Sequence, residues 1–240
     1  MRIFQKGFNF SQDGPGNRLV YHLQGCNLRC PWCSNPEGLV SDCGEERSIE
    51  DLVAEVNRSK LMFFDGGGVT LTGGEVCMQF SQLRALLSAL HREGIHTCIE
   101  TNGIHPNLPV LFPDLDLLIM DIKHYDPAIH KAVTGAENRL TQQNIVAALA
   151  SEQALALRIP LIGGFNADVQ DAHGFARLLT ELGVPGKATV ELLPYHEYGK
   201  DKYVRLGLPY TMGPKAKVTR QQVQAVKAVL EEAGICVICT

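Results

Sequence analysis

Three cysteines lie within eight residues near the start of this 240-residue chain: Cys26, Cys30 and Cys33. Their spacing, i, i+4 and i+7, would align them on one face of a helix. The residues around them favour a loop instead, because Pro31 would remove a helical hydrogen bond, and Gly25 and Pro36 interrupt the same stretch. We therefore predict a loop over residues 25–38 whose three thiols surround a common ligand.

Clustered thiols in a long chain without a secretory signal favour metal binding over disulfides. Structural zinc needs four protein ligands, and no second Cys-x2-Cys or His pair lies nearby, although Cys43 or His22 would serve as the fourth. An iron–sulfur cluster also normally takes four thiolates, so three leave one iron open to a substrate or cofactor. The other cysteines lie in apolar stretches and are interpreted as small buried hydrophobic residues: Cys77, Cys98, Cys236 and Cys239.

Predicted strands and helices alternate along the chain. The strands cover residues 18–23, 68–72, 96–101, 117–122, 156–162, 188–193 and 235–238. The helices cover residues 49–58, 81–93, 141–153, 171–182 and 219–233, with a short proline-bounded helix before the fourth strand. About six βα units in succession predict one α/β domain over residues 1–240, with a parallel sheet closed or partly closed as a barrel. An open doubly wound sheet is the alternative.

Several polar groups fall at the C-terminal ends of these strands, where α/β barrels hold their active sites. In strand order they are Cys26, then Gly73, Gly74 and Glu75, then Glu100 and Thr101, then Asp121 and Lys123, then Arg158 within the fifth strand, and His196. Asp121 and Lys123 are two residues apart and share one face of their strand, so a structural ion pair is one interpretation. For the Gly-Gly-Glu run, the alternative to a ligand-binding role is a plain strand-to-helix turn.

The composition excludes some classes of protein. The net charge is −4 and the lysines and arginines are scattered, which disfavours nucleic-acid binding. The N-terminus has no apolar signal region, and no stretch of about 18 apolar residues follows it, so we expect a cytoplasmic protein without a membrane segment.

The pattern Cys26-x3-Cys30-x2-Cys33, with an aromatic at Trp32, resembles the signature of radical S-adenosylmethionine (SAM) enzymes. Further blocks keep the order and spacing of pyruvate formate-lyase activating enzymes: 13–16 (DGPG), 66–70 (GGGVT), 101–103 (TNG), 121–123 (DIK) and 191–197 (ELLPYHE). The resemblance implies a partial (β/α)6 TIM-like barrel of the radical SAM type, one 4Fe–4S cluster and SAM. Between residues 34 and 65 the chain has one cysteine, so no ferredoxin-like insert is expected.

The resemblance also implies a role for each matching position. The three loop cysteines would hold the cluster, with Trp32 near the adenine of SAM. SAM would be bound by Gly73, Gly74, Glu75, Lys123 and His196. Asp13 and Arg158, the candidate catalytic residues, would lie toward SAM or a peptide substrate at the barrel mouth. A monovalent cation, Na⁺ or K⁺, would be bound by Glu100, Thr101 and Asp121, although Glu100 stands where this family has aspartate.

The activity that the resemblance implies is that of an oxidoreductase, which cleaves SAM reductively and removes a Cα hydrogen from a glycine of a partner glycyl radical enzyme. Other expectations are a flavodoxin or ferredoxin as electron donor and a monomeric state. The basic loop 200–205 is a candidate rim for the peptide, or else a solvated face. Two other functions remain open: a radical SAM enzyme acting on a small molecule, and a zinc-stabilised, non-enzymatic binding protein.

Overall fold

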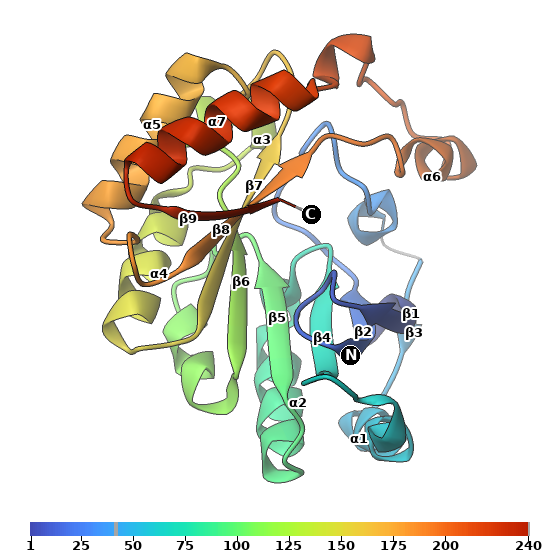
Figure 1. Cartoon of the computed structure of the whole chain (residues 1–240). Coiled ribbons are helices and arrows are strands. Elements are labelled where there is room, and N and C mark those ends of the chain that lie inside the picture. Colours follow the sequence, from blue (N-terminus) through green and yellow to red (C-terminus); the bar gives the residue numbers. More distant parts are fainter. Residues whose placement is uncertain (41–42, 240) are drawn as a thin grey trace. The chain divides into compact units, whose positions relative to one another are not determined.

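The computed structural model describes residues 1–40 and 43–239 (Figure 1). The chain forms two compact units. The first consists of Met1–Asn27, Asn35–Thr101 and His105–Ile119, and the second of Leu28–Ser34, Asn102–Ile104 and Met120–Thr240. The predicted cysteine loop therefore contributes Cys26 to the first unit and Cys30 and Cys33 to the second. Among the described residues, no helix has the length and apolarity needed to span a membrane.

The first unit is built on five strands in the order β3-β1-β2-β4-β5. They are β1 (Arg2–Phe10), β2 (Asn17–Leu23), β3 (Glu45–Glu46), β4 (Gly68–Gly73) and β5 (Thr97–Thr101). The predicted strands β2, β4 and β5 are parallel, as expected, whereas β1 runs antiparallel to both β2 and β3. The sequence did not predict β1 and β3. Most β1 residues are exposed, so that strand lacks the apolar alternation that marks a half-buried one.

The helices of the first unit confirm the sequence pattern. Helix α1 (Ile49–Arg58) begins after Ser48, whose hydroxyl accepts a hydrogen bond from the Asp51 amide at 3.1 Å. Helix α2 (Phe80–Arg92) buries its predicted leucine stripe: Leu83, Leu86, Leu87 and Leu90. The other helical segments are the 3-10 turns η1 (Pro36–Leu39), η2 (Lys60–Met62), η3 (Val76–Gln79) and η4 (Leu108–Asp114). The proline-bounded η4 is the short helix expected before the fourth strand.

The second unit contains three parallel strands in the order β7-β8-β9. They are β7 (Leu155–Leu161), β8 (Thr189–Pro194) and β9 (Cys236–Cys239). Strand β6 (Leu117–Asp121) is divided, with its last two residues in this unit. The helices are α3 (Pro127–Thr134), α4 (Arg139–Ala150), α5 (Val169–Glu181), α6 (Lys200–Arg205) and α7 (Arg220–Glu232), with the turn η5 (Pro214–Ala216). Helices α5 and α7 lie side by side in Figure 1.

Two sequence interpretations are wrong in this unit. Residues 200–205, which were expected to form a basic loop, are helix α6, and helix α3 was not predicted. Helix α6 has six residues, too few for an apolar period to emerge. Cys236 is exposed rather than buried, whereas Cys77 and Cys98 are buried as expected.

A buried arginine organises the start of β2 in the first unit. Arg18 is completely buried, and its Nε donates to the Thr70 hydroxyl at 2.6 Å. Its terminal nitrogens donate to the carbonyls of Pro15, at 3.1 Å, and Val69, at 2.7 Å. Since a buried charge is costly unless it is hydrogen-bonded, these bonds fix the segment before β2 against β4. The sequence signal was a charged residue inside a predicted core strand.

Candidate functional site

The two ends of the cysteine loop, Gly25 and Gly38, meet at a point that we call the neck of the loop. Residues 25–35 contain no helix, as predicted, whereas residues 36–38, also predicted as loop, belong to the 3-10 turn η1. The Gly25 amide donates to the Gly38 carbonyl at 3.0 Å, and these two glycines are the predicted ends of the loop. The thiols at positions 26, 30 and 33 are half-buried, and none of them forms a disulfide. The chain therefore leaves β2, passes through the three cysteines and returns to its starting point.

The neck is pressed against the Gly-Gly-Glu turn that follows β4. A Cβ atom added at Gly74 would lie 2.2 Å from the Gly25 carbonyl oxygen and 3.3 Å from the Cβ of Cys26. A Cβ added at Gly38 would lie 2.9 Å from the Cα of Gly74. The Glu75 amide also donates to the Gly25 carbonyl at 2.7 Å. Glycine is required here because the backbones of the loop and the turn touch directly.

Glu75 is almost fully buried, and its carboxylate is held by the protein. Its Oε1 accepts hydrogen bonds from the Cys77 amide at 3.0 Å and from the Thr101 hydroxyl at 2.6 Å. The first of these bonds caps η3, so the strand-to-turn interpretation is confirmed, while a SAM contact stays a prediction. Burial, followed by the charge of Glu75, raises the pKa of Cys77 far above its usual range. Cys77 is therefore a neutral thiol.

The three predicted cation ligands divide between the two units. Glu100 Oε2 accepts a hydrogen bond from the Thr72 hydroxyl at 2.8 Å, and Thr101 donates to Glu75, so these neighbours on β5 face different partners. Both belong to the first unit, whereas Asp121 belongs to the second. Thr72 was missed by sequence reasoning. The available signal was its position two residues after Thr70 on the same face of β4.

Asp121 and Lys123 form the ion pair that their spacing predicted. Lys123 Nζ donates to Asp121 Oδ2 at 2.6 Å, and the lysine side chain is only 11% exposed. The backbone after β6 is held by two buried asparagines that the sequence did not single out. Asn166 donates to the Lys123 carbonyl at 2.8 Å, and Asn138 donates to the His124 carbonyl at 2.5 Å. These bonds fix the course of the segment that carries Lys123.

An aromatic cluster connects the cysteine loop to this segment within the second unit. The ring centroids of Trp32 and Phe165 lie 4.9 Å apart, and those of Phe165 and His124 lie 5.1 Å apart. His124 is 1% exposed, and its Nδ1 accepts from the Asp126 amide at 3.0 Å. Burial lowers the pKa of His124, so it is neutral in this cluster at pH 7.

Arg158 is paired across the sheet. It lies directly opposite Glu191 on β8, and its Nε donates to Glu191 Oε2 at 2.6 Å. Both side chains are close to 90% buried, with exposed fractions of 12% and 10%. Sequence reasoning gave Glu191 no role of its own, although its charge in a predicted core strand was the signal. An ion pair of this kind fixes the direction of the Arg158 guanidinium.

His196 lies in the second unit and Asp13 in the first. His196 follows β8, stacks on Tyr198 with ring centroids 4.1 Å apart, and has its pKa lowered by partial burial. Asp13 precedes β2 in the first unit, and its backbone carbonyl accepts a hydrogen bond from the Thr70 hydroxyl at 2.6 Å, on β4. Its carboxylate accepts a hydrogen bond from Asn9. A role of Asp13 toward SAM or a peptide stays a prediction.

Tyr203 lies beside two of the loop cysteines. It is 6% exposed, and its ring meets that of Tyr210 edge-on at 5.3 Å. Burial, followed by the charges of Cys33 and Cys30, raises the pKa of Tyr203 to about 12. The tyrosine therefore stays protonated at pH 7 and covers this side of the loop. Sequence reasoning missed it because it had assigned no helix to its segment.

The model of the Radical SAM superfamily matches residues 20–176 of the chain. This chain belongs to the radical SAM superfamily. It is 34% identical, over 92% of each chain, to the pyruvate formate-lyase 1-activating enzyme of Escherichia coli (strain K12). It is 32% identical to the (2S)-3-sulfopropanediol dehydratase activating enzyme of Klebsiella oxytoca, over 95% of this chain and 93% of the relative. These radical SAM relatives are activating enzymes of glycyl radical enzymes.

The radical SAM fold is also recognised in three dimensions. A crystal structure of a radical SAM methyltransferase from Sphaerobacter thermophilus superposes with a TM-score of 0.68, covering 97% of this chain and 68% of that one, at 16% identity. The predicted fold class, a partial barrel of parallel strands and helices, is therefore confirmed.

A radical SAM fold implies a 4Fe–4S cluster and SAM, and the cysteine loop fits the cluster. The three half-buried thiols of the closed loop have the number and chemistry that would hold such a cluster. Among the described residues, no three His, Cys, Asp or Glu side chains are grouped closely enough for a single metal ion. Thiolates on different irons of one cluster stand farther apart than ligands of one ion.

We expect Gly74→Ala to destabilise the protein by about 1–3 kcal/mol, because the new methyl group would overlap the Gly25 carbonyl and open the neck. Denaturant unfolding of the unreconstituted protein measures the change. The control is Gly7→Ala, since no atom lies within 4 Å of the added Cβ at that position. Equal stability of the two variants would show that the neck tolerates a side chain.

The unfolding free energy should fall as the pH drops below about 6.5, the ordinary pKa of histidine. Folding lowers the pKa of His124, so the unfolded chain binds more protons than the native state in this range. His124→Asn keeps an acceptor for the Asp126 amide and should flatten the slope of stability against pH. The matched variant at exposed His173, His173→Asn, should leave the slope unchanged. An unaltered slope in His124→Asn would contradict this assignment.

Proposed function

We propose that the chain is a SAM-dependent activating enzyme for a glycyl radical enzyme of the pyruvate formate-lyase type. The observation that carries the proposal is the closed three-cysteine loop, which the Gly-Gly-Glu turn touches at its neck. Similarity to activating enzymes over 92% of the chain supports it. Held by Cys26, Cys30 and Cys33, the cluster would supply the one electron for reductive cleavage of SAM to methionine and a 5′-deoxyadenosyl radical, and the partner's glycine would give up its Cα hydrogen to that radical.

The residues of this chain bind and orient SAM rather than move protons. In the proposed site, Cys26, Cys30 and Cys33 hold the cluster and Trp32 packs near the adenine. Glu75, with the backbone of Gly73 and Gly74, takes the ammonium group, because a carboxylate whose position is fixed by two hydrogen bonds pairs well with a cation. Lys123 exchanges Asp121 for the SAM carboxylate, and His196 makes a further contact with SAM.

Two residues are proposed to face the peptide, Arg158 of the second unit and Asp13 of the first. Arg158, held by Glu191, faces SAM or the peptide with its guanidinium. Asp13 contacts the peptide from the start of β2. The partner enzyme delivers its glycine on a flexible segment, and glycine suits this because it has no side chain to obstruct approach.

The proposal extends to the setting of the reaction. Both compact units act as a single domain over residues 1–240, without a ferredoxin-like insert and with one cluster. The protein works as a cytoplasmic monomer, without nucleic acid or a membrane as partner, and receives its electron from a flavodoxin or ferredoxin. The lack of an insert is supported by the comparison with the Klebsiella oxytoca relative, where the alignment runs over 299 residues, more than this chain contains.

Replacing Cys26, Cys30 or Cys33 by alanine should abolish iron incorporation on anaerobic reconstitution, and with it reductive SAM cleavage. Each change removes one of the three thiolates, and the two that remain are too few to hold the cluster. Iron content and the electron spin resonance signal of the reduced cluster are the measurements. The control is the exposed Cys236→Ala, which should keep the iron of the parent protein.

Two outcomes of the same reconstitution would favour the other functions. Zinc without iron in the parent protein would favour the zinc-stabilised binding protein. SAM cleavage without a glycyl radical on any neighbouring glycyl radical enzyme would favour a small-molecule substrate.

We also propose that Glu100, Thr101 and Asp121 bind Na⁺ or K⁺ beside the SAM carboxylate. SAM cleavage should then be faster in buffers of K⁺ or Na⁺ than in tetramethylammonium, which is too large for a carboxylate-lined site. Glu100→Gln should remove this dependence because it removes a charged ligand. The exposed Glu232→Gln is the control. Equal rates in all three salts would contradict the cation site.

A further inference from the structure

Helix α6 is packed directly on the cysteine loop. A Cβ atom added at Gly199, just before α6, would lie 2.7 Å from the Cys33 carbonyl oxygen and 3.0 Å from the Cα of Ser34. Tyr203, on the inner face of α6, is buried beside Cys30 and Cys33. All of these residues belong to the second unit. The start of the helix thus touches the cysteine loop, and its buried tyrosine lies beside two of the three cysteines.

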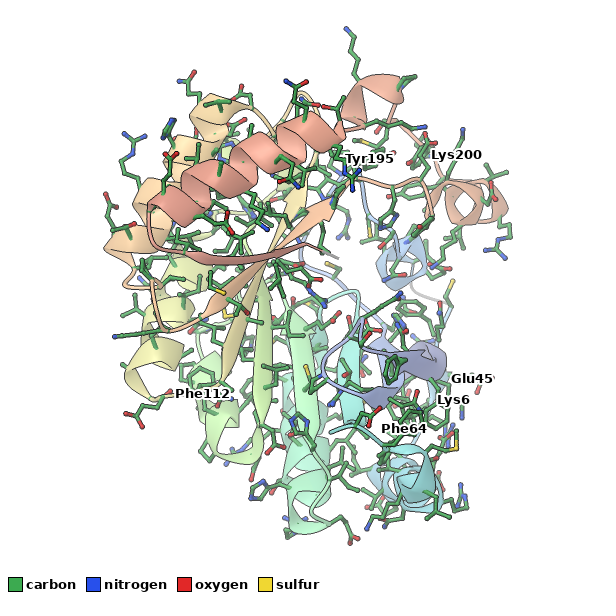
Figure 2. All side chains as sticks on the ribbon, viewed as in Figure 1. Lys6, Glu45, Phe64, Phe112, Tyr195 and Lys200 are labelled. Atoms are coloured by element: carbon green, nitrogen blue, oxygen red, sulfur yellow. The ribbon has the colours of Figure 1, made fainter. Side chains whose placement is uncertain are left out.

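The outer face of α6 is exposed and carries more basic than acidic side chains, Lys200 and Arg205 against Asp201. Lys200 is labelled in Figure 2. Neither Lys200 nor Arg205 forms an ion pair with any other residue in the described ranges. Apolar surface lies beside them, since Val204 is 72% exposed and Tyr198 is 81% exposed. The stretch 197–217 has five lysines or arginines against two acidic residues, whereas the whole chain has a net charge of −4. The net charge of this stretch is therefore positive, whereas that of the whole chain is negative.

We propose that the outer face of α6 is the docking surface for the one-electron donor, a carrier protein with an acidic face around its redox centre. The inference rests on the proposed function, which requires an electron to be delivered to the cluster. One electron leaves the carrier and enters the cluster, so the carrier is oxidised and the cluster reduced by one unit, and no bond changes in this step.

Distance and charge both favour the carrier over the glycyl radical enzyme as the occupant. Electron transfer slows steeply with distance, and a donor on α6 is separated from Cys30 and Cys33 by one helix, about 10 Å across. Unpaired positive charge on an otherwise acidic chain accelerates encounter with an acidic partner and repels others.

The test compares two double charge reversals in the reconstituted full-length protein. The first is Lys200→Glu with Arg205→Glu. The matched control is Lys187→Glu with Arg177→Glu, at exposed positions elsewhere in the second unit. Each protein is reduced by photoreduced flavodoxin and, separately, by photoreduced deazariboflavin, a small reductant that needs no docking surface. Loss of the visible absorption of the cluster gives the reduction rate without SAM present.

The α6 variant should be reduced about tenfold more slowly by flavodoxin at low salt, with a weaker dependence on ionic strength, and at the parent rate by deazariboflavin. Equal flavodoxin rates in the α6 variant and the control would overturn the proposal. So would a normal flavodoxin rate combined with a loss of glycyl radical formation under deazariboflavin, because the surface would then bind the glycyl radical enzyme. Failure of the proposed function itself would appear differently, as a reducible cluster that cleaves no SAM in the parent protein.

Discussion

Direct contact between two backbones, at Gly25, Gly38 and Gly74, is the constraint on which the cysteine loop depends. The hydrogen bond from Gly25 to Gly38 closes the loop, and the contact with Gly74 ties it to the end of β4. Any side chain at Gly74 would separate the two segments. The neck of the loop and the Gly-Gly-Glu turn are therefore packed against each other, which keeps Cys26 close to Glu75.

The charged residues of the candidate site are held by protein partners. Glu75 accepts from Thr101, Lys123 donates to Asp121, and Arg158 is paired with Glu191. Such pairing lowers the cost of burying each charge and restricts its rotamers before SAM binds. In the proposed function, SAM takes the place of one of these partners. The gain is preorganisation, since less has to be rearranged when the substrate arrives.

The regular elements and the cysteine loop were predictable because their signals are local. The strands β2 and β4 follow from apolar runs, the start of α1 follows from its Ser48 cap, and the loop follows from proline and glycine around the cysteines. Strand β1 and helix α6 were not predictable, because β1 is mostly exposed and α6 has only six residues. Most of the residues that support the site carry no local signal either. Asn166 and Tyr203 are common residue types whose importance comes from what they touch.

The sequence by itself determined the chemistry: three thiols at fixed spacing, a glycine-rich turn with a carboxylate, and an alternation of strands and helices that places polar groups at strand ends. Spacing along the chain is sufficient for these features because each one depends on neighbouring residues. Only the tertiary structure decided the partners, such as Glu191 for Arg158, Asn166 for the backbone of Lys123 and helix α6 for the cysteine loop. These contacts join residues far apart in the sequence, and the packing of the folded chain selects them.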